Sequence, residues 1–168
     1  GAEFGVVNGW ERALCFPPKG FEDIPGYRFQ PEREAVIAGE VAAVANGVGL
    51  MEVSGFSRYR LSGDGVVDAM DRLIAGRMPK EGRVSLSYLL TQKGNVLSEA
   101  TLARLGDDEI WYGAAAAAEW HDRDWLAAHL PKNIRIDNLS QSHTVLVLAG
   151  PKSREVLRQV AGHEDWSN

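Results

Sequence analysis

Apolar residues recur along the chain with two different periods, which predict helices and strands in alternation. Spacing of three and four residues predicts helices over residues 32–47, 64–75, 115–129 and from Pro151 to 161. Alternating apolar and polar positions bounded by turn residues predict strands over residues 50–54, 57–62, 84–91, 95–104, 109–114, 133–138 and 143–149. Strand pairs that alternate with single helices are typical of an α+β fold, with a mostly antiparallel sheet that carries its helices on one face.

The first 31 residues follow neither period. Prolines and glycines interrupt them, which predicts an extended lead-in with short strands. The aromatic side chains of this lead-in indicate that it packs on other parts of the protein; they are Trp10, Phe16, Phe21, Tyr27 and Phe29. We therefore expect two parts, a lead-in over residues 1–31 and a domain over residues 32–168.

Composition narrows the class of protein. The chain has 168 residues, of which 45% are hydrophobic and 24% charged, and this is typical of a soluble globular domain. Its net charge of −5, with both signs interspersed, argues against a nucleic-acid surface. No apolar run reaches the ~20 residues of a membrane span, and no secretory signal is visible at the start. The single cysteine, Cys15, is expected to be a packed apolar residue in a reducing compartment.

Two sequence patterns resemble functional motifs but are better explained by structural roles. Residues 63–68, GDGVVD, imitate half of a dinucleotide fingerprint, yet Asp68 replaces the third glycine. We expect a turn into a helix that Asp64 caps. The histidines do not lie at metal-ligand spacing, so we expect surface residues and no metal site; they are His121, His129, His143 and His163.

Glu99 is an acid inside an apolar strand pattern. Alternation along the strand places Glu99 on one face with Leu97, Thr101 and Ala103, and Ser98, Ala100 and Leu102 on the other. One interpretation is an acid on a solvated strand face. The other is a carboxylate that hydrogen-bonds a basic heterocycle or a reacting nitrogen in a ligand pocket.

Several segments carry a family resemblance. Residues 49–63 (GLMEVSGFSRYRLSG), 86–102 (LSYLLTQKGNVLSEATL) and 148–157 (LAGPKSREVL) resemble, in order and spacing, segments of the aminomethyltransferase family, the glycine-cleavage T-proteins. Residues 1–13 (GAEFGVVNGWERA) are similar to the start of the folate domain in the dimethylglycine and sarcosine dehydrogenase branch. The chain resembles the first part of that domain, since a downstream pterin-clamping glutamate segment and a small β-barrel are not in the sequence.

The resemblance implies a site. Glu99 falls at the position of the family's catalytic acid, where most members carry aspartate. Phe56, Leu86, Trp111 and Gly113 fall at folate-lining positions, and Tyr88 and Tyr112 are adjacent to them. Glutamate is one methylene longer than aspartate, which would move the carboxylate ~1–1.5 Å.

The resemblance also implies an activity. We expect a tetrahydrofolate-binding, one-carbon-transfer module of a demethylating oxidoreductase, with FAD on a neighbouring domain or chain. The alternatives are a non-catalytic regulatory or interaction module of the same fold and a flavin-independent, folate-dependent methyltransferase. Expected partners are folate, a flavin oxidase domain or chain, and a second copy in a homodimer that covers exposed apolar surface. The cytoplasm or the mitochondrial matrix is the expected location.

Overall fold

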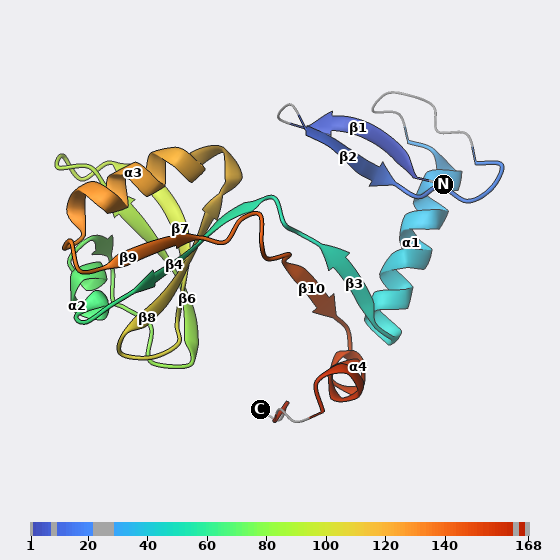
Figure 1. Ribbon diagram of the computed structural model, residues 1–168. Coiled ribbons are helices and arrows are strands. Elements are labelled where there is room, and N and C mark those ends of the chain that lie inside the picture. The colour runs from blue at the N-terminus through green and yellow to red at the C-terminus, as the bar shows by residue number, and fades with distance from the viewer. Residues whose placement is uncertain (1, 8–9, 22–28, 163–164, 167–168) are drawn as a thin grey trace. The chain divides into compact units, whose positions relative to one another are not determined.

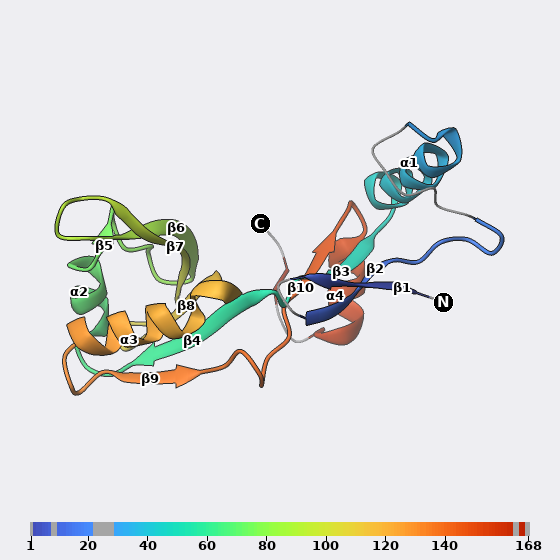
Figure 2. The same ribbon diagram turned by 90° about the horizontal axis from the view of Figure 1, so that it is seen from above.

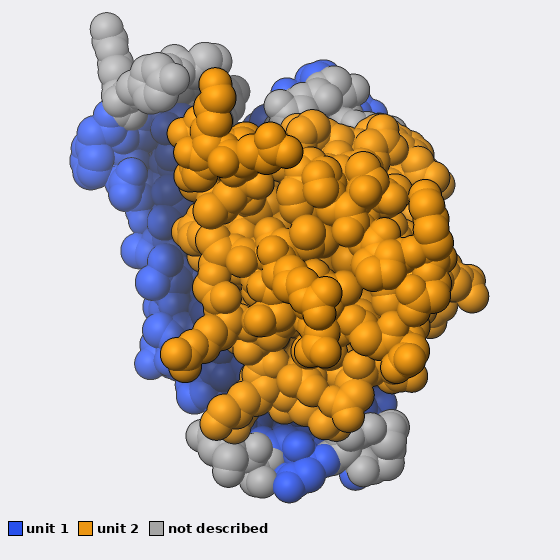
Figure 3. Space-filling view, turned by 90° about the vertical axis from the view of Figure 1, so that its left-hand side faces the viewer, with its two compact units in different colours: residues 1–51, 147–168 blue, residues 52–146 orange. Residues whose placement is uncertain are grey.

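The computed structural model describes residues 2–7, 10–21, 29–162 and 165–166. The chain divides into two compact units, which Figure 3 colours separately. Unit 1 consists of residues 1–51 and 147–168, and unit 2 consists of residues 52–146. All the site residues expected from the sequence lie in unit 2.

Unit 2 is built on a six-stranded sheet with the order β5-β6-β7-β8-β4-β9 (Figure 1). Its strands are β4 (Phe56–Ser62), β5 (Ile74–Ala75), β6 (Arg83–Leu90), β7 (Val96–Arg104), β8 (Glu109–Ala115) and β9 (Arg135–Asn138). Every neighbouring pair is antiparallel. The prediction of an α+β fold with a mostly antiparallel sheet is confirmed.

One face of this sheet is covered by helices α2 (Val66–Asp71) and α3 (Glu119–His129), as Figure 2 shows. Successive side chains of a strand point to opposite faces, so alternate residues of each strand enter the core beneath the helices. The largest fully buried apolar side chains of this core are Tyr59, Leu61, Val66, Met70, Leu89, Leu102, Ile110, Tyr112 and Leu126. The predicted alternation is confirmed from Ser98 onward, because Ser98, Ala100 and Leu102 are buried while Glu99 and Thr101 are exposed. It is wrong at the start of the strand, where the pairing of β6 with β7 is irregular: Val96 is exposed and Leu97 packs against the core.

Tyr59 ties the sheet to α3, because its hydroxyl donates to the carbonyl oxygen of Glu119 at 2.8 Å. Burial, reinforced by the carboxylate of Glu119, raises the pKa of Tyr59 to about 12. The folded protein therefore holds this proton more tightly than the unfolded chain, whose tyrosines ionise near pH ~10. The resulting stabilisation is complete below pH ~10 and is lost as the pH rises toward about 12.

We expect the free energy of unfolding to fall between pH ~9 and ~12, with a smaller fall in Tyr59→Phe. Urea unfolding at a series of pH values measures both slopes. If Tyr59→Phe lost stability as steeply as the wild type, this origin of the alkaline sensitivity would be wrong.

The second predicted helix is shorter than expected. The sequence pattern indicated a helix over residues 64–75, but α2 ends at Asp71 and β5 follows it. The expected cap is also wrong: Gly65, in the left-handed region with φ of 77°, is the capping residue, and Asp64 makes no side-chain cap. Pairing of Ile74 with Leu89 and of Ala75 with Tyr88 supplies backbone hydrogen bonds that local helical spacing could not foretell.

The other elements agree with the prediction to within a few residues, with three differences. The alanine-rich start of the third helix is a short 3-10 turn, η1 (Ala116–Ala118), before α3. The last strand, β10 (Leu146–Ala149), begins three residues later than expected. Helix α4 (Ser153–Val160) begins after Pro151, with Lys152 at its cap.

Unit 1 contains the hairpin β1 (Glu3–Val7) and β2 (Trp10–Cys15), helix α1 (Pro31–Asn46), strand β3 (Gly49–Glu52) paired with β10, and α4. Helix α1 has no buried residue. Among the described residues of this unit, many large apolar side chains are exposed, including Phe4, Leu14, Phe16, Phe29 and Val41. The expectation that the lead-in aromatics pack is wrong for Phe16 and Phe29; Tyr27 lies outside the described residues, and the side chain of Trp10 is not described.

Cys15 corrects another expectation. It is exposed at the end of β2 rather than packed, and its thiol lies 3.5 Å from Oε2 of Glu3 across the hairpin. Over the part of the chain that the structure describes, none of the helices combines the length and the apolar character that crossing a membrane requires.

Candidate functional site

The sheet face opposite α2 and α3 carries the residues that the sequence singled out. We call it the open face, because neither helix of unit 2 covers it. Its side chains come from alternate positions of five strands: Phe56, Arg58 and Arg60 of β4, Leu86 and Tyr88 of β6, Glu99, Thr101 and Ala103 of β7, Trp111, Gly113 and Ala115 of β8, and Asp137 of β9.

The register arranges these side chains in rows across the strands. Tyr88 lies directly opposite Glu99 in the first row. The second row runs Leu86, Thr101, Gly113 and Arg58, and the third runs Ala103, Trp111, Arg60 and Asp137. From strand dimensions, the Cα atoms of Glu99 and Trp111 lie about 14 Å apart. One ring cannot touch both, but an elongated ligand can reach from one to the other.

Glu99 is exposed, and Tyr88 lies directly opposite it on β6. A hydrogen bond between the Tyr88 hydroxyl and the Glu99 carboxylate raises the pKa of Tyr88. The phenol and the carboxylate thus act on one another across the strand pair. This pair presents an acceptor and an aromatic surface next to each other, which suits a flat heterocycle with N–H groups.

The rest of the expected lining divides between the two faces. Phe56 and Leu86 are exposed on the open face, at 51% and 56%, and Trp111 is half-buried there. Tyr112 does not belong to this face, and its assignment to the folate lining is corrected. It points into the core, is 1% exposed, and donates its hydroxyl to Asp122.

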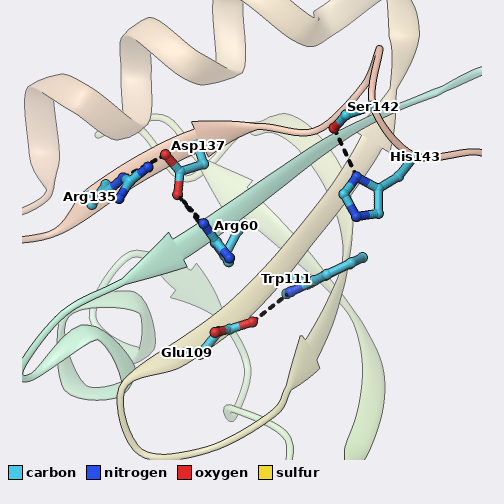
Figure 4. Close-up of polar contacts among 7 residues, drawn as sticks. All are labelled: Arg60, Glu109, Trp111, Arg135, Asp137, Ser142 and His143. Carbon is cyan, nitrogen blue, oxygen red and sulfur yellow. Dashed lines mark hydrogen bonds and ion pairs between the residues drawn. The ribbon is translucent and has the colours of Figure 1, made fainter.

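Trp111 is held in place from two sides, as Figure 4 shows. Its indole Nε1 donates to Oε1 of Glu109 at 2.9 Å. The imidazole of His143 meets the indole edge to face, with centroids 5.4 Å apart and an interplanar angle of 88°. Nδ1 of His143 lies 2.8 Å from Oγ of Ser142. His143 is an exposed residue, as expected, but it also borders the open face.

Arg58 fastens the segment that carries His143. Arg58 is 7% exposed, and its guanidinium donates to the carbonyl oxygens of Ser54, Phe56 and Ser140. The main chain of Arg58 accepts from the amide of Leu139 at 2.7 Å and donates to Oγ of Ser140 at 2.9 Å. The segment after β9 is thus tied to β4 by side-chain and main-chain bonds, which positions His143 beside Trp111.

The far end of the open face carries an ionic group, also drawn in Figure 4. Arg60 approaches Oδ2 of Asp137 at 2.8 Å, and Arg135 donates to Oδ1 at 2.6 Å. The hydrogen bond from Arg60 lowers the pKa of Asp137, assisted by Arg135. Two guanidinium groups thus share the Asp137 carboxylate near Trp111, and the carboxylate of Glu109 also acts on Arg60, so this end of the face carries charges of both signs.

The open face is not an enclosed pocket within the described residues. A cavity of about 320 Å³ lies elsewhere in unit 2, lined in part by Arg72, Leu90, Trp125 and His129. Among the described residues, no group of three or more His, Cys, Asp or Glu side chains could hold a metal ion.

Some residues of this arrangement gave no signal in the sequence. Arg58 and Asp137 reach the open face through the register of β4 and β9. His143 reaches it because hydrogen bonds hold the segment after β9 to Arg58. Once the pairing of β6, β7 and β8 is known, strand alternation places Leu86, Thr101 and Trp111 on the same face as Glu99.

Comparison with known proteins gives consistent results. The GCVT N-terminal domain matches residues 1–168. The chain is 28% identical over 173 residues to mitochondrial dimethylglycine dehydrogenase of Homo sapiens, an alignment that covers 98% of this chain and 19% of that protein. It is 26% identical over 168 residues to the aminomethyltransferase of Picosynechococcus sp., with 98% of this chain and 41% of that protein covered.

The fold has a close counterpart among solved structures. The crystal structure of glycine cleavage system aminomethyltransferase T from Bartonella henselae matches with a TM-score of 0.74 and 22% identity. The match covers 95% of this chain and 40% of that one. The chain therefore has the fold of the first part of that protein, and it spans about a fifth to two fifths of the length of these relatives.

Proposed function

Because the chain belongs to the GCVT N-terminal domain family, we propose that its open face binds tetrahydrofolate, with Glu99 as the polar contact. The observation that carries the proposal is the grouping of Glu99, Tyr88, Leu86 and Gly113 on one sheet face. The aminomethyltransferase family uses folate, and the resemblance of residues 86–102 to a segment of that family supports Glu99 as the acidic residue.

The chemistry of the open face suits this ligand. Tetrahydrofolate joins a flat pterin, rich in N–H groups, to a p-aminobenzoyl arm, so it needs a carboxylate acceptor and apolar surface along one direction. Glu99 supplies an acceptor that forms charge-assisted hydrogen bonds. Leu86 and Phe56 supply exposed apolar surface, and the row that contains Gly113 offers space between Glu99 and Trp111. The guanidinium groups of Arg60 and Arg135 lie beyond Trp111, where the carboxylate end of an extended ligand would point.

We propose a role in one-carbon transfer on the same grounds. Glu99 would hold a reacting folate nitrogen in position and accept a proton from it, as a general base does. Apolar neighbours would keep water from the one-carbon unit. The unit would come from an N-methyl amine oxidised by a flavin domain or chain, a partner that the similarity to dimethylglycine dehydrogenase suggests. In a eukaryote, such a protein would work in the mitochondrial matrix; otherwise we propose the cytoplasm.

Gly113 provides a test of where the ligand lies. A Cβ at this position would meet only the carbonyl oxygens of Ser57 at 3.6 Å and Thr101 at 3.9 Å, which are ordinary contacts. Gly113→Val should therefore fold normally, and a β-branched residue suits a strand. Its side chain would stand on the open face between Glu99 and Trp111. We expect tetrahydrofolate affinity to fall at least about tenfold, because overlap of a few atoms costs more than ~1.4 kcal/mol.

A matched control is Ala128→Val, which adds a comparable side chain at an exposed position of α3, on the other side of the sheet. Thermal unfolding should show that both variants are folded. Unchanged affinity in Gly113→Val would show that the ligand does not cross this row.

The direct experiment is anaerobic calorimetric titration of the chain with tetrahydrofolate. Because the open face covers only one side of a ligand, we expect weak binding, at best with a dissociation constant in the high micromolar range, that is roughly −4 to −5 kcal/mol. An absence of binding at millimolar tetrahydrofolate would remove the folate proposal for this chain.

One observation favours a second candidate, a non-catalytic interaction module of the same fold. Val84, Leu86 and Phe56 are 65%, 56% and 51% exposed on the open face, and exposed apolar groups on a sheet mark contact surfaces for other proteins. Under this candidate the chain would not bind tetrahydrofolate. Unit 1 also exposes apolar side chains, and a homodimer that covers some of them stays a prediction for sedimentation analysis.

A further inference from the structure

The carboxyl group of Asp122 is buried in unit 2, on the helix-covered side of the sheet. It lies in the first turn of α3 and is 0% exposed. Oδ2 accepts hydrogen bonds from Oγ of Ser98 at 2.7 Å and from the hydroxyl of Tyr112 at 2.7 Å. Oδ1 lies 3.1 Å from Nδ1 of His121. Burial of a carboxyl group is costly unless it is hydrogen-bonded, and here several donors meet that need.

Both strand donors are neighbours of open-face residues. Ser98 precedes Glu99 in β7, and Tyr112 lies between Trp111 and Gly113 in β8. Adjacent residues of a strand point to opposite faces, so a bond made beneath the sheet holds the backbone from which the open-face side chain rises. One oxygen atom of Asp122 thus joins the strand of Glu99 to the strand of Trp111.

A core without charge could give similar stability, because well-packed apolar groups often replace buried polar ones without loss. What a satisfied polar network adds is a single, fixed arrangement of its members. At this place a fixed arrangement has a consequence, because a shift of β7 by a fraction of an ångström would move Glu99 relative to the other strands. Sites of ligand binding and catalysis depend on such supporting contacts.

We propose that Asp122 is a positioning residue, which fixes Glu99 from the far side of the sheet through its hydrogen bonds to Ser98 and Tyr112. The effect of Asp122 on ligand binding rests on the proposed function. Its effect on the position of the Glu99 side chain does not rest on that function and can be measured without any ligand.

The titration of Tyr88 reports on the position of the Glu99 carboxylate. Tyr88 lies directly across the strand pair from Glu99, and hydrogen bonding to that carboxylate raises the pKa of Tyr88. The titration of Tyr88, followed by NMR of ring-labelled tyrosine, therefore measures how well Glu99 is held. Glu99→Gln removes the charge and gives the lower limit of the Tyr88 pKa, which calibrates the reporter.

The test removes one tether. Ser98→Ala deletes the bond from β7 to Asp122, and Ser98→Thr keeps a hydroxyl at the same place. The control is Ser57→Ala, a buried serine on the same side of the sheet whose Oγ donates to the carbonyl oxygen of Ala114 and not to Asp122. Both alanine variants lose one buried hydroxyl bond, so a general loosening of the sheet would affect them alike.

We expect Ser98→Ala to lower the pKa of Tyr88 toward the Glu99→Gln limit, whereas Ser57→Ala and Ser98→Thr keep the wild-type value. Tetrahydrofolate affinity should fall about tenfold in Ser98→Ala and by less than about twofold in the control. A Tyr88 pKa that is unchanged in Ser98→Ala, or equally lowered in Ser57→Ala, overturns the proposal. Failure of the wild type to bind tetrahydrofolate would contradict the proposed function, and the Tyr88 titration would still decide this inference.

Discussion

Replacement of Glu99 by alanine is expected to weaken tetrahydrofolate binding by about ten- to 150-fold. The reason is the loss of a hydrogen bond to a charged acceptor, which is worth about 1.5–3 kcal/mol. Glu99→Gln keeps the shape and one acceptor oxygen but loses the charge, so its affinity should fall between those of the wild type and Glu99→Ala. Calorimetric titration of the three proteins under identical conditions measures the series.

The control for this series is Glu81→Gln, an exposed acid in the turn before β6, away from the open face. It changes the net charge by the same amount as Glu99→Gln, so it separates a local contact from a general electrostatic effect. Equal affinities in Glu99→Ala and the wild type would show that the carboxylate is only a solvated strand residue, the other interpretation that the sequence left open.

Leu102→Ala should mainly lower the stability of the protein, whereas Leu86→Ala should mainly lower its affinity for the ligand. The reason is that the two side chains lie on opposite faces of the sheet, on adjacent strands. Leu102 is fully buried beneath α3 and α2, whereas Leu86 is 56% exposed on the open face. Leu102→Ala should lower the free energy of unfolding by about 2–5 kcal/mol, through lost burial and a cavity. Leu86→Ala should change the free energy of unfolding by only about 0.5 kcal/mol, but it should weaken ligand binding.

Urea unfolding gives the two stabilities, and titration gives the two affinities. A small loss of stability in Leu102→Ala would contradict the assignment of the core to the helix-covered face. A large loss in Leu86→Ala, with unchanged affinity, would mean that the open face is covered by protein rather than by ligand.

The sheet of unit 2 could be predicted from the sequence because its strands alternate clearly. In β7, the alternation of Ser98, Ala100 and Leu102 with Glu99 and Thr101 assigned each side chain to its correct face. The turns at Gly94 and at Gly106 to Asp108 fixed where β6, β7 and β8 begin and end. Glu99 was therefore identified, and its face assigned, before the pairing was known.

Features that depend on tertiary pairing could not be predicted. Ile74 and Ala75 continue a helical spacing, but the edge of β6 recruits them as a strand. Tyr112 was grouped with Trp111 through resemblance, although strand alternation alone places the two on opposite faces. The contact of His143 with Trp111 depends on hydrogen bonds between Arg58 and the segment after β9, which no local pattern reveals.

Binding of tetrahydrofolate on the open face can be followed residue by residue. In an NMR titration of the 15N-labelled chain, each amide reports its own surroundings. We expect tetrahydrofolate to shift the amides of Glu99, Thr101 and Gly113 in proportion to occupancy, while amides of α2, such as that of Met70, stay in place. Saturable shifts confined to α2 and α3, or to the cavity beside Trp125 and His129, would contradict it.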